Sequence, residues 1–473
     1  MNLQGQRVTV MGLGRFGGGV GVSRFLVSQG ARVLVTDLLS EAKLTHSIAQ
    51  LADCPIEFRL GEHREQDFTN TDLIVVNPAV DPRQNPYLQA AAAARIPTTT
   101  EIRLLVEHLP NRARTIGITG SAGKSTTTAM IGHILQRFYQ PIASKDAAVS
   151  PPPRPKVWVG GNLGGSLLDQ LPNIRYQDWV VLELSSFMLE EMGQAAQTGQ
   201  FAGWSPHVAI VTNIAPNHLD RHGTLAAYAA AKQQILAHQA SDDIAILGSD
   251  LPSQIQPRHH RVIYAPSLDQ LQGTISLKIP GKHNQLNAWM AVEACLAAGI
   301  SPRHSTAALG DFPGLIHRMQ FVAQAQGVSY FNDSKATTPE ATQLALESFP
   351  SGIVHVILGG YDKGSDLTAL AQFAVNHCRG IYTIGTTGPL IAQAAQSALA
   401  GSSSSSAVCV HDCGTLDAAV EKIMPQLRAG DTVLLSPACA SWDQYENFEA
   451  RGNAFVQAVL RCTGEGAATV AST

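Results

Sequence analysis

A short glycine-rich segment constrains the fold of this chain more than any other part of the sequence. Residues 114–119 are rich in β-branched side chains and predict a strand, and Gly120-Ser-Ala-Gly-Lys-Ser-Thr126 leads from it into a predicted helix that ends near Phe138. Backbone N–H groups in such a turn point inward, and the helix N-terminus adds the positive end of its dipole. The segment therefore favours a polyphosphate, with Lys124 reaching the β- and γ-phosphates and Ser125 binding Mg²⁺.

The match to the general phosphate-loop pattern is incomplete. That pattern requires a glycine five residues before Gly123, where this chain has Ile118. A glycine turn that only packs a strand against a helix is the alternative, but it leaves the Lys-Ser pair unexplained. We interpret the segment as nucleotide-binding, through Gly120, Ser121, Ala122, Gly123, Lys124, Ser125 and Thr126.

A second glycine-rich turn lies near the N-terminus. Gly12, Gly14 and Gly17 follow a predicted strand and precede a predicted helix at 22–29, and Asp37 ends the next strand. This is the dinucleotide-binding fingerprint, which supports an NAD-dependent dehydrogenase as an alternative function. A turn that binds nothing is another alternative. UDP-sugars also carry a pyrophosphate, and a dehydrogenase has no need of a second loop with Lys-Ser.

Over the first hundred residues, predicted strands alternate with helical stretches, which indicates a parallel sheet covered by helices. At roughly 100–200 residues per domain, the length suggests about three domains. We expect an α/β protein with a Rossmann-like N-terminal domain (1–109), a central ATPase domain of the phosphate-loop type (110–314) and a Rossmann-like C-terminal domain (315–473). Strands are expected at 7–11, 31–37, 72–77, 114–119, 179–184, 208–213, 354–358, 380–384 and 432–435, and a further helix at 225–238.

Three segments predict irregular structure. Residues 140–156 include Pro151, Pro152, Pro153 and Pro155 and suggest an exposed loop or insertion. The serine run at 401–406 predicts a flexible surface loop, and the small polar tail from Gly464 predicts disorder.

Composition excludes several classes of function. The net charge is -4 and no long basic run exists, so we expect no nucleic-acid partner. The absence of an apolar run of membrane length and of a charged leader predicts no membrane insertion and a cytoplasmic location. The seven cysteines are scattered and odd in number, which predicts no disulfide framework. Cys409 and Cys413 are a possible metal-ligand pair, but no second pair accompanies them, so we expect buried thiols.

The motifs of this chain resemble those of the Mur ligase family, in the family's order and over nearly the whole length. In the middle of the chain they are 119–126, 160–162, 183–187, 217–221, 228–232 and 281–287. Towards the C-terminus they are 317–318, 332–337, 359–364 and 435–441. Segments 332–337 and 436–452 resemble the D-glutamate-adding branch, and the Asp-Asn-Pro-Arg motif of diaminopimelate- or lysine-adding relatives is absent from the sequence.

The resemblance implies an ATP-dependent amide ligase of peptidoglycan precursor synthesis, with UDP-MurNAc-L-Ala and D-glutamate as substrates. ATP would phosphorylate the alanyl carboxylate, and the amine of D-glutamate would displace the phosphate. Two Mg²⁺ ions suit this charge. The same ligation with another amino acid, such as L-glutamate or glutamine, and a non-enzymatic nucleotide-binding regulator are alternatives. We expect a monomer.

The resemblance also assigns catalytic roles. Lys124, Glu183, His218 and Lys232 are the implied catalytic residues, and Ser125 joins the last three as a metal ligand. An ammonium group has no lone pair, so Lys232 would bind a cation only as a carbamate formed with CO₂, which needs a neutral amine. A solvated helix lysine is the alternative.

Further implied roles concern the substrates. The ATP-binding set gains Asn284, Asn287, Arg318 and Asp333; an N-cap role for Asn284 is its alternative. The UDP-substrate set is Gly14, Arg15, Phe16, Asp37, Asn77, Asn162 and His218, and Asn162 is alternatively a turn residue. The D-glutamate set is Lys335, Thr337, Lys363, Ser441 and Phe448. Since two domains would supply the ATP site, domain closure on binding is expected.

Four places depart from the family's usual residues. Ala122 replaces a polar residue of the phosphate loop, where backbone donors suffice. Leu38, Leu39 and Asn77-Pro-Ala79 stand on the uridine side, so the departures bear on uridine recognition rather than on ATP chemistry.

Overall fold

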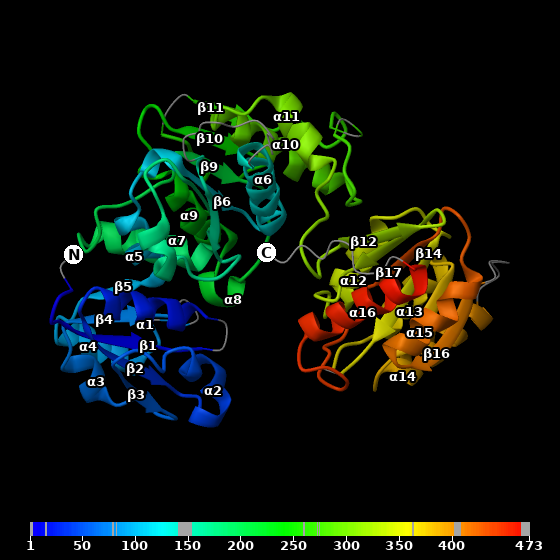
Figure 1. Ribbon diagram of the computed structural model, residues 1–473, viewed down its shortest axis with the longest axis horizontal. Helices are drawn as coiled ribbons and strands as arrows, with labels where there is room; N and C mark the ends of the chain where they lie inside the picture. Colours follow the sequence, from blue (N-terminus) through cyan, green and yellow to red (C-terminus); the bar gives the residue numbers. More distant parts are fainter. Residues whose placement is uncertain are drawn as a thin grey trace, which may run out of the picture. The chain divides into compact units, whose positions relative to one another are not determined.

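The computed structural model describes residues 3–464 except 15–16, 78–79, 82, 141–153, 259–260, 272, 274, 362–363 and 402–407. These residues form three sheets of five, six and six strands (Figure 1). Two compact units hold them: residues 1–270 with 287–308, and residues 271–286 with 309–473. We call the parts of the chain that hold the three sheets the N-terminal, central and C-terminal regions. The predicted α/β class is confirmed, whereas the predicted domain bounds stay predictions.

The N-terminal region is a parallel sheet in the order β3-β2-β1-β4-β5. Its strands are β1 (Arg7–Met11), β2 (Arg32–Asp37), β3 (Ile56–Leu60), β4 (Leu73–Val76) and β5 (Thr98–Thr100). Its helices are α1 (Gly18–Ser28), α2 (Glu41–Ala49), α3 (Glu65–Thr69), α4 (Pro86–Ala93) and α5 (Glu101–His108). Val8 and Val10 pack on one face and Met11 on the other, so helices cover both faces. The strand order reverses between β1 and β4, where α/β sheets bind ligands.

The central region is a parallel sheet in the order β11-β10-β9-β6-β8-β7. Its strands are β6 (Thr115–Thr119), β7 (Val157–Gly161), β8 (Trp179–Glu183), β9 (Val208–Val211), β10 (Ile244–Leu247) and β11 (Val262–Tyr264). The helices of this part of the chain are α6 (Lys124–Tyr139), α7 (Ser186–Gln197), α8 (Leu219–His222), α9 (Leu225–Gln233), α10 (Lys282–Ala297) and α11 (Pro302–Leu309). β6, β8 and β9 are fully buried, as expected for strands covered on both faces.

The C-terminal region has the order β12-β13-β17-β14-β15-β16. Its strands are β12 (Gln320–Ala325), β13 (Val328–Asn332), β14 (Val354–Gly359), β15 (Gly380–Ile384), β16 (Cys409–Gly414) and β17 (Thr432–Leu435). Its helices are α12 (Pro339–Glu347), α13 (Thr368–His377), α14 (Gly388–Gly401), α15 (Leu416–Ile423) and α16 (Phe448–Thr463). In this sheet β12 and β13 are antiparallel, whereas the other neighbouring strands are parallel. Gln326 and Gly327 both have positive φ, the geometry of a tight hairpin turn.

Several local predictions are refined by the structure. The helix predicted at 22–29 begins at Gly18, and the one at 225–238 is split into α9 and the 3₁₀-helix η3 (Gln234–Leu236). Further 3₁₀-helices are η1 (Arg112–Arg114), η2 (Leu168–Asn173) and η4 (Met424–Gln426). The proline-rich segment, the serine run and the tail lie largely outside the described residues. Among the described residues, no helix is both long and apolar enough to cross a bilayer.

All seven cysteines are free, as the sequence predicts. Cys409 and Cys413 are half-buried, so the expectation of buried thiols is wrong for this pair. Neither belongs to a group of metal-ligand spacing among the described residues. The group that has such spacing is His207, Asp242 and Asp243, and there Arg112 pairs with the buried Asp243 at 2.7 Å.

Candidate active site

The phosphate loop joins β6 to α6, as the sequence predicts. Its two glycines have positive φ, 143° at Gly120 and 82° at Gly123, which favours glycine. A side chain at Gly123 would also collide with the Asn287 amide oxygen, and one at Gly120 with the Thr212 hydroxyl. These positions therefore exclude other residues by both conformation and space.

The end of β9 braces this loop. The Ser121 amide donates to the Asn213 carbonyl at 2.8 Å, and the Ala122 amide donates to Asn213 Oδ1 at 3.0 Å. The Thr212 hydroxyl donates to the Ala122 carbonyl at 2.6 Å. The loop backbone at Ala122 is thus held by neighbours, which explains how it tolerates alanine. The expectation that its amides point inward is not met at Ser121 and Ala122, because both amides have protein acceptors.

Two lysines converge on this loop. Lys124 Nζ donates to the carbonyls of Gly120 and Ser121, at 3.0 and 3.1 Å. Lys232 Nζ, from α9, donates to the same Gly120 carbonyl at 2.8 Å and to Thr119 Oγ1 at 3.3 Å. Lys232 is 1% exposed, so the alternative of a solvated helix lysine is wrong. Burial, followed by the charge of Lys124, lowers the pKa of Lys232 to about 7, although the Glu183 carboxylate opposes the shift.

Glu183 ends β8 and is 2% exposed. Its Oε1 accepts a hydrogen bond from Asn162 Nδ2 at 3.0 Å. Its Oε2 is buried and has no hydrogen-bond partner among the described residues. A buried carboxylate oxygen is unfavourable unless it is paired, and carboxylate oxygens are preferred Mg²⁺ ligands. The structure therefore leaves one oxygen suited to a cation, while Asn162, a turn residue next to Gly161, orients the other.

His218 is exposed. It directly precedes α8 and has a φ of 52°. Its ring centroid is 4.9 Å from that of Phe187, which lies shortly after Glu183 in the chain. His222 and Tyr228 had no predicted role. His222 is buried, forms a 3.0 Å hydrogen bond with Ser186 Oγ, and has a pKa lowered by burial. The signal that could have identified Tyr228 was its spacing from Lys232, because residues four apart share one face of a helix.

The two asparagines of α10 differ. Asn287 lies against the phosphate loop, with Oδ1 3.4 Å from Thr127 Oγ1. Asn284 donates to the Pro280 carbonyl at 2.6 Å. Because α10 begins at Lys282, Asn284 is inside the helix and the N-cap alternative is wrong.

The N-terminal turn is organised by Asp37. This buried carboxylate accepts the amides of Gly14 and Leu39, at 3.0 and 2.8 Å. Asn77 lies beside Gly12, where an added Cβ would be 3.1 Å from the Asn77 Cβ. The structure thus brings Gly14, Asp37 and Asn77 together. Arg15 and Phe16 lie outside the described residues.

Within the C-terminal region, Asp333 is buried and Arg318 is exposed. Asp333 accepts the Ser436 hydroxyl at 2.9 Å and the Met319 amide at 3.1 Å. Burial raises the pKa of Asp333 to about 7. Its oxygens therefore hold the turn that carries Arg318.

The residues implied for D-glutamate are partly brought together. Lys335 Nζ is 5.6 Å from the Phe448 ring centroid. Thr337 is half-buried and Ser441 is buried, while Lys363 lies outside the described residues. Arg451 was not predicted from the sequence. It is 1% exposed and donates to the carbonyls of three residues: Ser334, Cys439 and Ala440. Arg451 thereby ties the segment before Lys335 to the segment before Ser441.

The fold and the lysine–carboxylate cluster define a phosphate-loop α/β protein, and three family models identify it further. They are described as "Mur ligase MurD-like, N-terminal domain" (residues 6–100), "Mur ligase middle domain" (118–267) and "Mur ligase, glutamate ligase domain" (317–439). The chain belongs to the Mur ligase family.

Full-length relatives agree. A protein of Koribacter versatilis (strain Ellin345) named "UDP-N-acetylmuramoylalanine--D-glutamate ligase" is 36% identical, with 98% of each chain covered. One of the same name from Roseiflexus sp. (strain RS-1) is 37% identical over 96% of this chain and 98% of its own. Among solved structures, the MurC ligase of Thermotoga maritima matches with a TM-score of 0.54 and 18% identity, over 96% of this chain and 99% of the other, which shows the fold alone.

Proposed function

We propose that this protein is an ATP-dependent ligase that joins D-glutamate to UDP-N-acetylmuramoyl-L-alanine in peptidoglycan precursor synthesis. The substrates follow from the names of relatives that match over their full lengths. The observation that carries the chemistry is the meeting of Lys124 and Lys232 at the Gly120 carbonyl, near enough to the Glu183 carboxylate for its charge to act on Lys232, while Glu183 Oε2 has no partner among the described residues.

In the first step, the alanyl carboxylate attacks the γ-phosphorus of ATP, the bond to the β-phosphate bridging oxygen breaks, and ADP leaves. The reaction is mainly positioning and charge neutralisation. Lys124 suits the β- and γ-phosphates, since its ammonium already reaches over the loop. Asn287 borders the loop from α10 and suits a contact to the nucleotide.

A divalent cation fits the oxygens around Glu183. The residues that would hold the cation are Glu183, Ser125 and His218, together with Lys232 if it carries a carbamate. When bound, Mg²⁺ neutralises phosphate and carboxylate charge. Glu183 supplies the buried oxygen, and Asn162 keeps that carboxylate oriented.

Lys232 is suited to carbamate formation. Its lowered pKa makes the neutral amine accessible near pH 7. The Nζ lone pair attacks the carbon of CO₂, and the electrons of one C=O π bond move onto its oxygen. One proton leaves the nitrogen. The product is an anionic oxygen ligand where an ammonium group stood.

In the second step, the amine of D-glutamate attacks the acyl phosphate, and phosphate leaves the tetrahedral intermediate. Lys335, Thr337, Lys363, Ser441 and Phe448 are the proposed pocket for D-glutamate. Cations and hydroxyls suit a dicarboxylate. The free thiols fit a reducing compartment, and we propose that the protein is a cytoplasmic monomer. Gel filtration of the purified chain tests the oligomeric state.

Phosphate release tests the proposed function. The protein is mixed with ATP, Mg²⁺ and UDP-MurNAc-L-Ala, and D-glutamate, L-glutamate or glutamine is added in separate reactions. Release of phosphate that requires D-glutamate supports the proposal. Release with L-glutamate or glutamine instead would mean that the protein adds that amino acid. No release together with NADH oxidation in a parallel assay would indicate the dehydrogenase alternative, and no turnover in either assay would favour the non-enzymatic regulator.

A further inference from the structure

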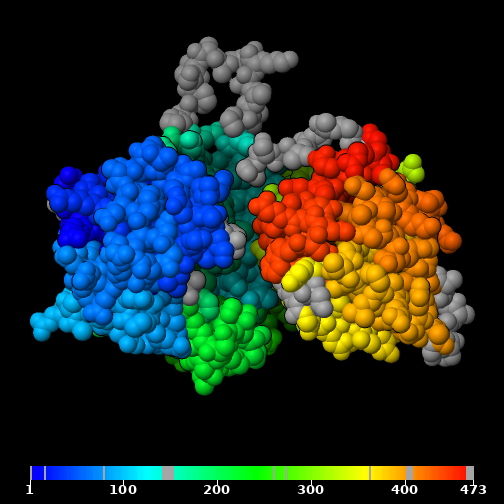
Figure 2. Space-filling model, turned by 90° about the horizontal axis from the view of Figure 1, so that it is seen from below, coloured from blue at the N-terminus to red at the C-terminus, as the bar shows by residue number. Residues whose placement is uncertain are grey.

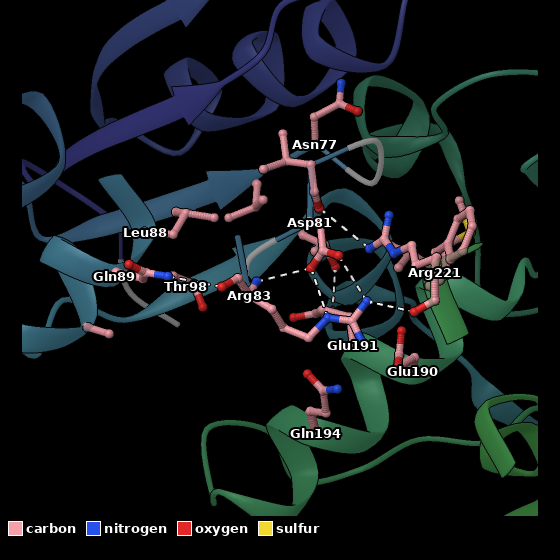
Figure 3. Close-up of a pocket in the computed structure, with 17 residues that line it drawn as sticks. Asn77, Asp81, Arg83, Leu88, Gln89, Thr98, Glu190, Glu191, Gln194 and Arg221 are labelled. Atoms are coloured by element: carbon pink, nitrogen blue, oxygen red, sulfur yellow. Dashed lines mark hydrogen bonds and ion pairs between the residues drawn. The ribbon is translucent and has the colours of Figure 1, made fainter. Parts of the chain in front are cut away.

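Two arginines connect the N-terminal region to the segment that carries His218. Arg83 Nη2 donates to the Arg221 carbonyl at 3.0 Å, and Arg221 Nη2 donates to the Val80 carbonyl at 3.5 Å (Figure 3). Each arginine thus reaches the backbone of the other's segment. We call this reciprocal pair the arginine latch. Both regions belong to one compact unit, and the blue N-terminal region adjoins the green segment of the central region in Figure 2.

Both guanidinium groups are held in place. Asp81 accepts Arg83 through both carboxylate oxygens, at 3.0 Å from Nε and 2.9 Å from Nη2, and this pairing lowers the pKa of Asp81 to about 2. The guanidinium of Arg221 lies 4.1 Å from the Phe187 ring centroid. A planar group stacked on an aromatic ring and one fixed by a bidentate carboxylate lose little freedom when the latch forms.

Side-chain packing does not fill the junction between the two regions behind the latch. Behind it lies a cavity of about 240 Å³ lined by both regions, including Val76, Leu88, Met188 and Glu190. Glu191 of α7, which also lines the cavity, accepts Arg103 and Thr100, both at 3.0 Å. The junction is therefore held at the cavity by this ion pair and by the latch.

The latch is linked to the proposed reaction centre on both sides. Phe187, under Arg221, contacts the His218 ring and stacks on His222 with centroids 5.4 Å apart. In the N-terminal region, the Val80 N–H donates to the Asn77 carbonyl at 2.9 Å. Asn77 is proposed to bind the UDP-substrate. Movement at the latch therefore displaces both a substrate contact and His218.

We infer that Arg83 and Arg221 are positioning residues that set Asn77 and Val80 of the N-terminal region against the segment that carries His218. This inference rests on the proposed function. The latch holds the alanyl carboxylate at the phosphate loop, and it does not contact the nucleotide. Its loss therefore affects the UDP-substrate selectively.

The test compares Arg83→Ala, Arg221→Ala, Arg221→Lys and the double alanine variant with the unmodified protein. We expect each alanine variant to lower kcat/KM for UDP-MurNAc-L-Ala about tenfold while the KM for ATP changes less than about twofold. The double variant should lose no more kcat/KM than the worse single variant, because either substitution alone already disrupts the latch. Arg221→Lys should fall between, because it keeps the charge and loses the planar stack.

Arg64→Ala is the matched control. Arg64 also pairs with a carboxylate two residues earlier, Glu62 at 2.5 Å, on the surface of the same region. It should match the unmodified protein in every rate. Losses that multiply in the double variant, or an equal rise in the KM for ATP, would overturn the latch, as would an unchanged kcat/KM.

Hydrogen exchange distinguishes failure of the latch from failure of the proposed function. In Arg83→Ala the amides of residues 218–222 should exchange faster, and those of β6 should not. This readout needs no turnover. If the unmodified protein ligates D-glutamate while Arg83→Ala changes neither exchange nor rates, only the latch is wrong. If the unmodified protein is inactive, the proposed function fails, and unchanged exchange would still reject the latch.

Discussion

Lys124 and Lys232 donate to one carbonyl oxygen, that of Gly120, at 3.0 and 2.8 Å. Two ammonium groups that share an acceptor repel each other, and this repulsion adds to burial in lowering the pKa of Lys232 to about 7. Near neutral pH a large fraction of Lys232 is therefore the neutral amine. That form can react with CO₂, whereas an exposed lysine is almost entirely protonated.

Lys232→Ala should lose most of the ligase activity, by about 100-fold or more, because the proposed carbamate ligand disappears. Short-chain carboxylic acids should restore part of it, since a small carboxylate can occupy the space left by the side chain. Phosphate release at increasing acetate or propionate measures the recovery. Lys124→Ala is the matched control and should not recover, as its role is cationic. Full activity of Lys232→Ala without any additive would contradict the carbamate.

Glu183→Gln should keep the fold and lose catalysis. The glutamine oxygen can still accept the Asn162 amide, as Oε1 does at 3.0 Å, while the partnerless buried oxygen is replaced by a neutral amide. We expect kcat to fall by about 100-fold or more and the required Mg²⁺ concentration to rise. Thermal unfolding without Mg²⁺ should show no loss of stability. Mg²⁺ dependence identical to that of the unmodified protein would refute a cation at Glu183.

Gly123→Ala should destabilise the phosphate loop and reduce ATP binding. The substitution forces an L-residue to a φ of 82° and places Cβ against the Asn287 oxygen. Gly165→Ala is the matched control, because Gly165 has the same φ of 82° and nothing within 4 Å of its added Cβ. Both variants carry backbone strain of roughly 1 kcal/mol, and Gly123→Ala adds roughly 1–3 kcal/mol of overpacking. Equal unfolding free energies for the two variants would show that the collision is relieved.

Asp333 should make stability depend on pH in the acid range. Burial raises its pKa from 3.8 to about 7, so the folded protein binds the proton more tightly than the unfolded chain. The stability from Asp333 is thus complete below about pH 4 and is lost as the pH rises towards 7. Relative to Asp333→Asn, the unfolding free energy of the C-terminal region should fall by a few kcal/mol over this range.

Urea unfolding at pH 4 and pH 7 measures this difference. Asp366→Asn is the control, because Asp366 is exposed and its pKa is lowered by hydrogen bonds to Thr368. Because Asp333 is intact in Asp366→Asn, this variant should lose stability between pH 4 and pH 7 to the same extent as the unmodified protein. A difference between Asp333→Asn and the unmodified protein that stays constant with pH would mean that Asp333 does not titrate there.

Much of the fold was predictable because its causes are local. Buried parallel strands are continuous apolar runs, so β1, β14 and β17 were found within a residue of their ends. The hairpin of β12 and β13 was missed, since polar residues at Gln320, Gln324 and Ser329 interrupt the apolar pattern. Its turn signal, Gln326-Gly327, is weaker than an Asn-Gly pair.

The predicted site residues fared differently according to how far their partners lie along the chain. Lys124 and Ser125 needed only the strand–turn–helix around them. Asp37 and Asp333 were predicted as ligand contacts, but each also accepts backbone amides, because buried carboxylate oxygens must be satisfied. Arg451 was missed because most of its acceptors are backbone carbonyls, which no side-chain motif encodes.

The sequence by itself determined the order of strands, glycine turns and helices, and with the motifs it determined the family. Those features depend on backbone conformation and side-chain periodicity over a few neighbouring residues. Only the tertiary structure decided that Lys232 lies on the Gly120 carbonyl, 112 positions away, and that Arg83 meets Arg221 across 138 positions. The reason is physical: burial, desolvation and pKa depend on which distant segments pack together, and local sequence does not specify that packing.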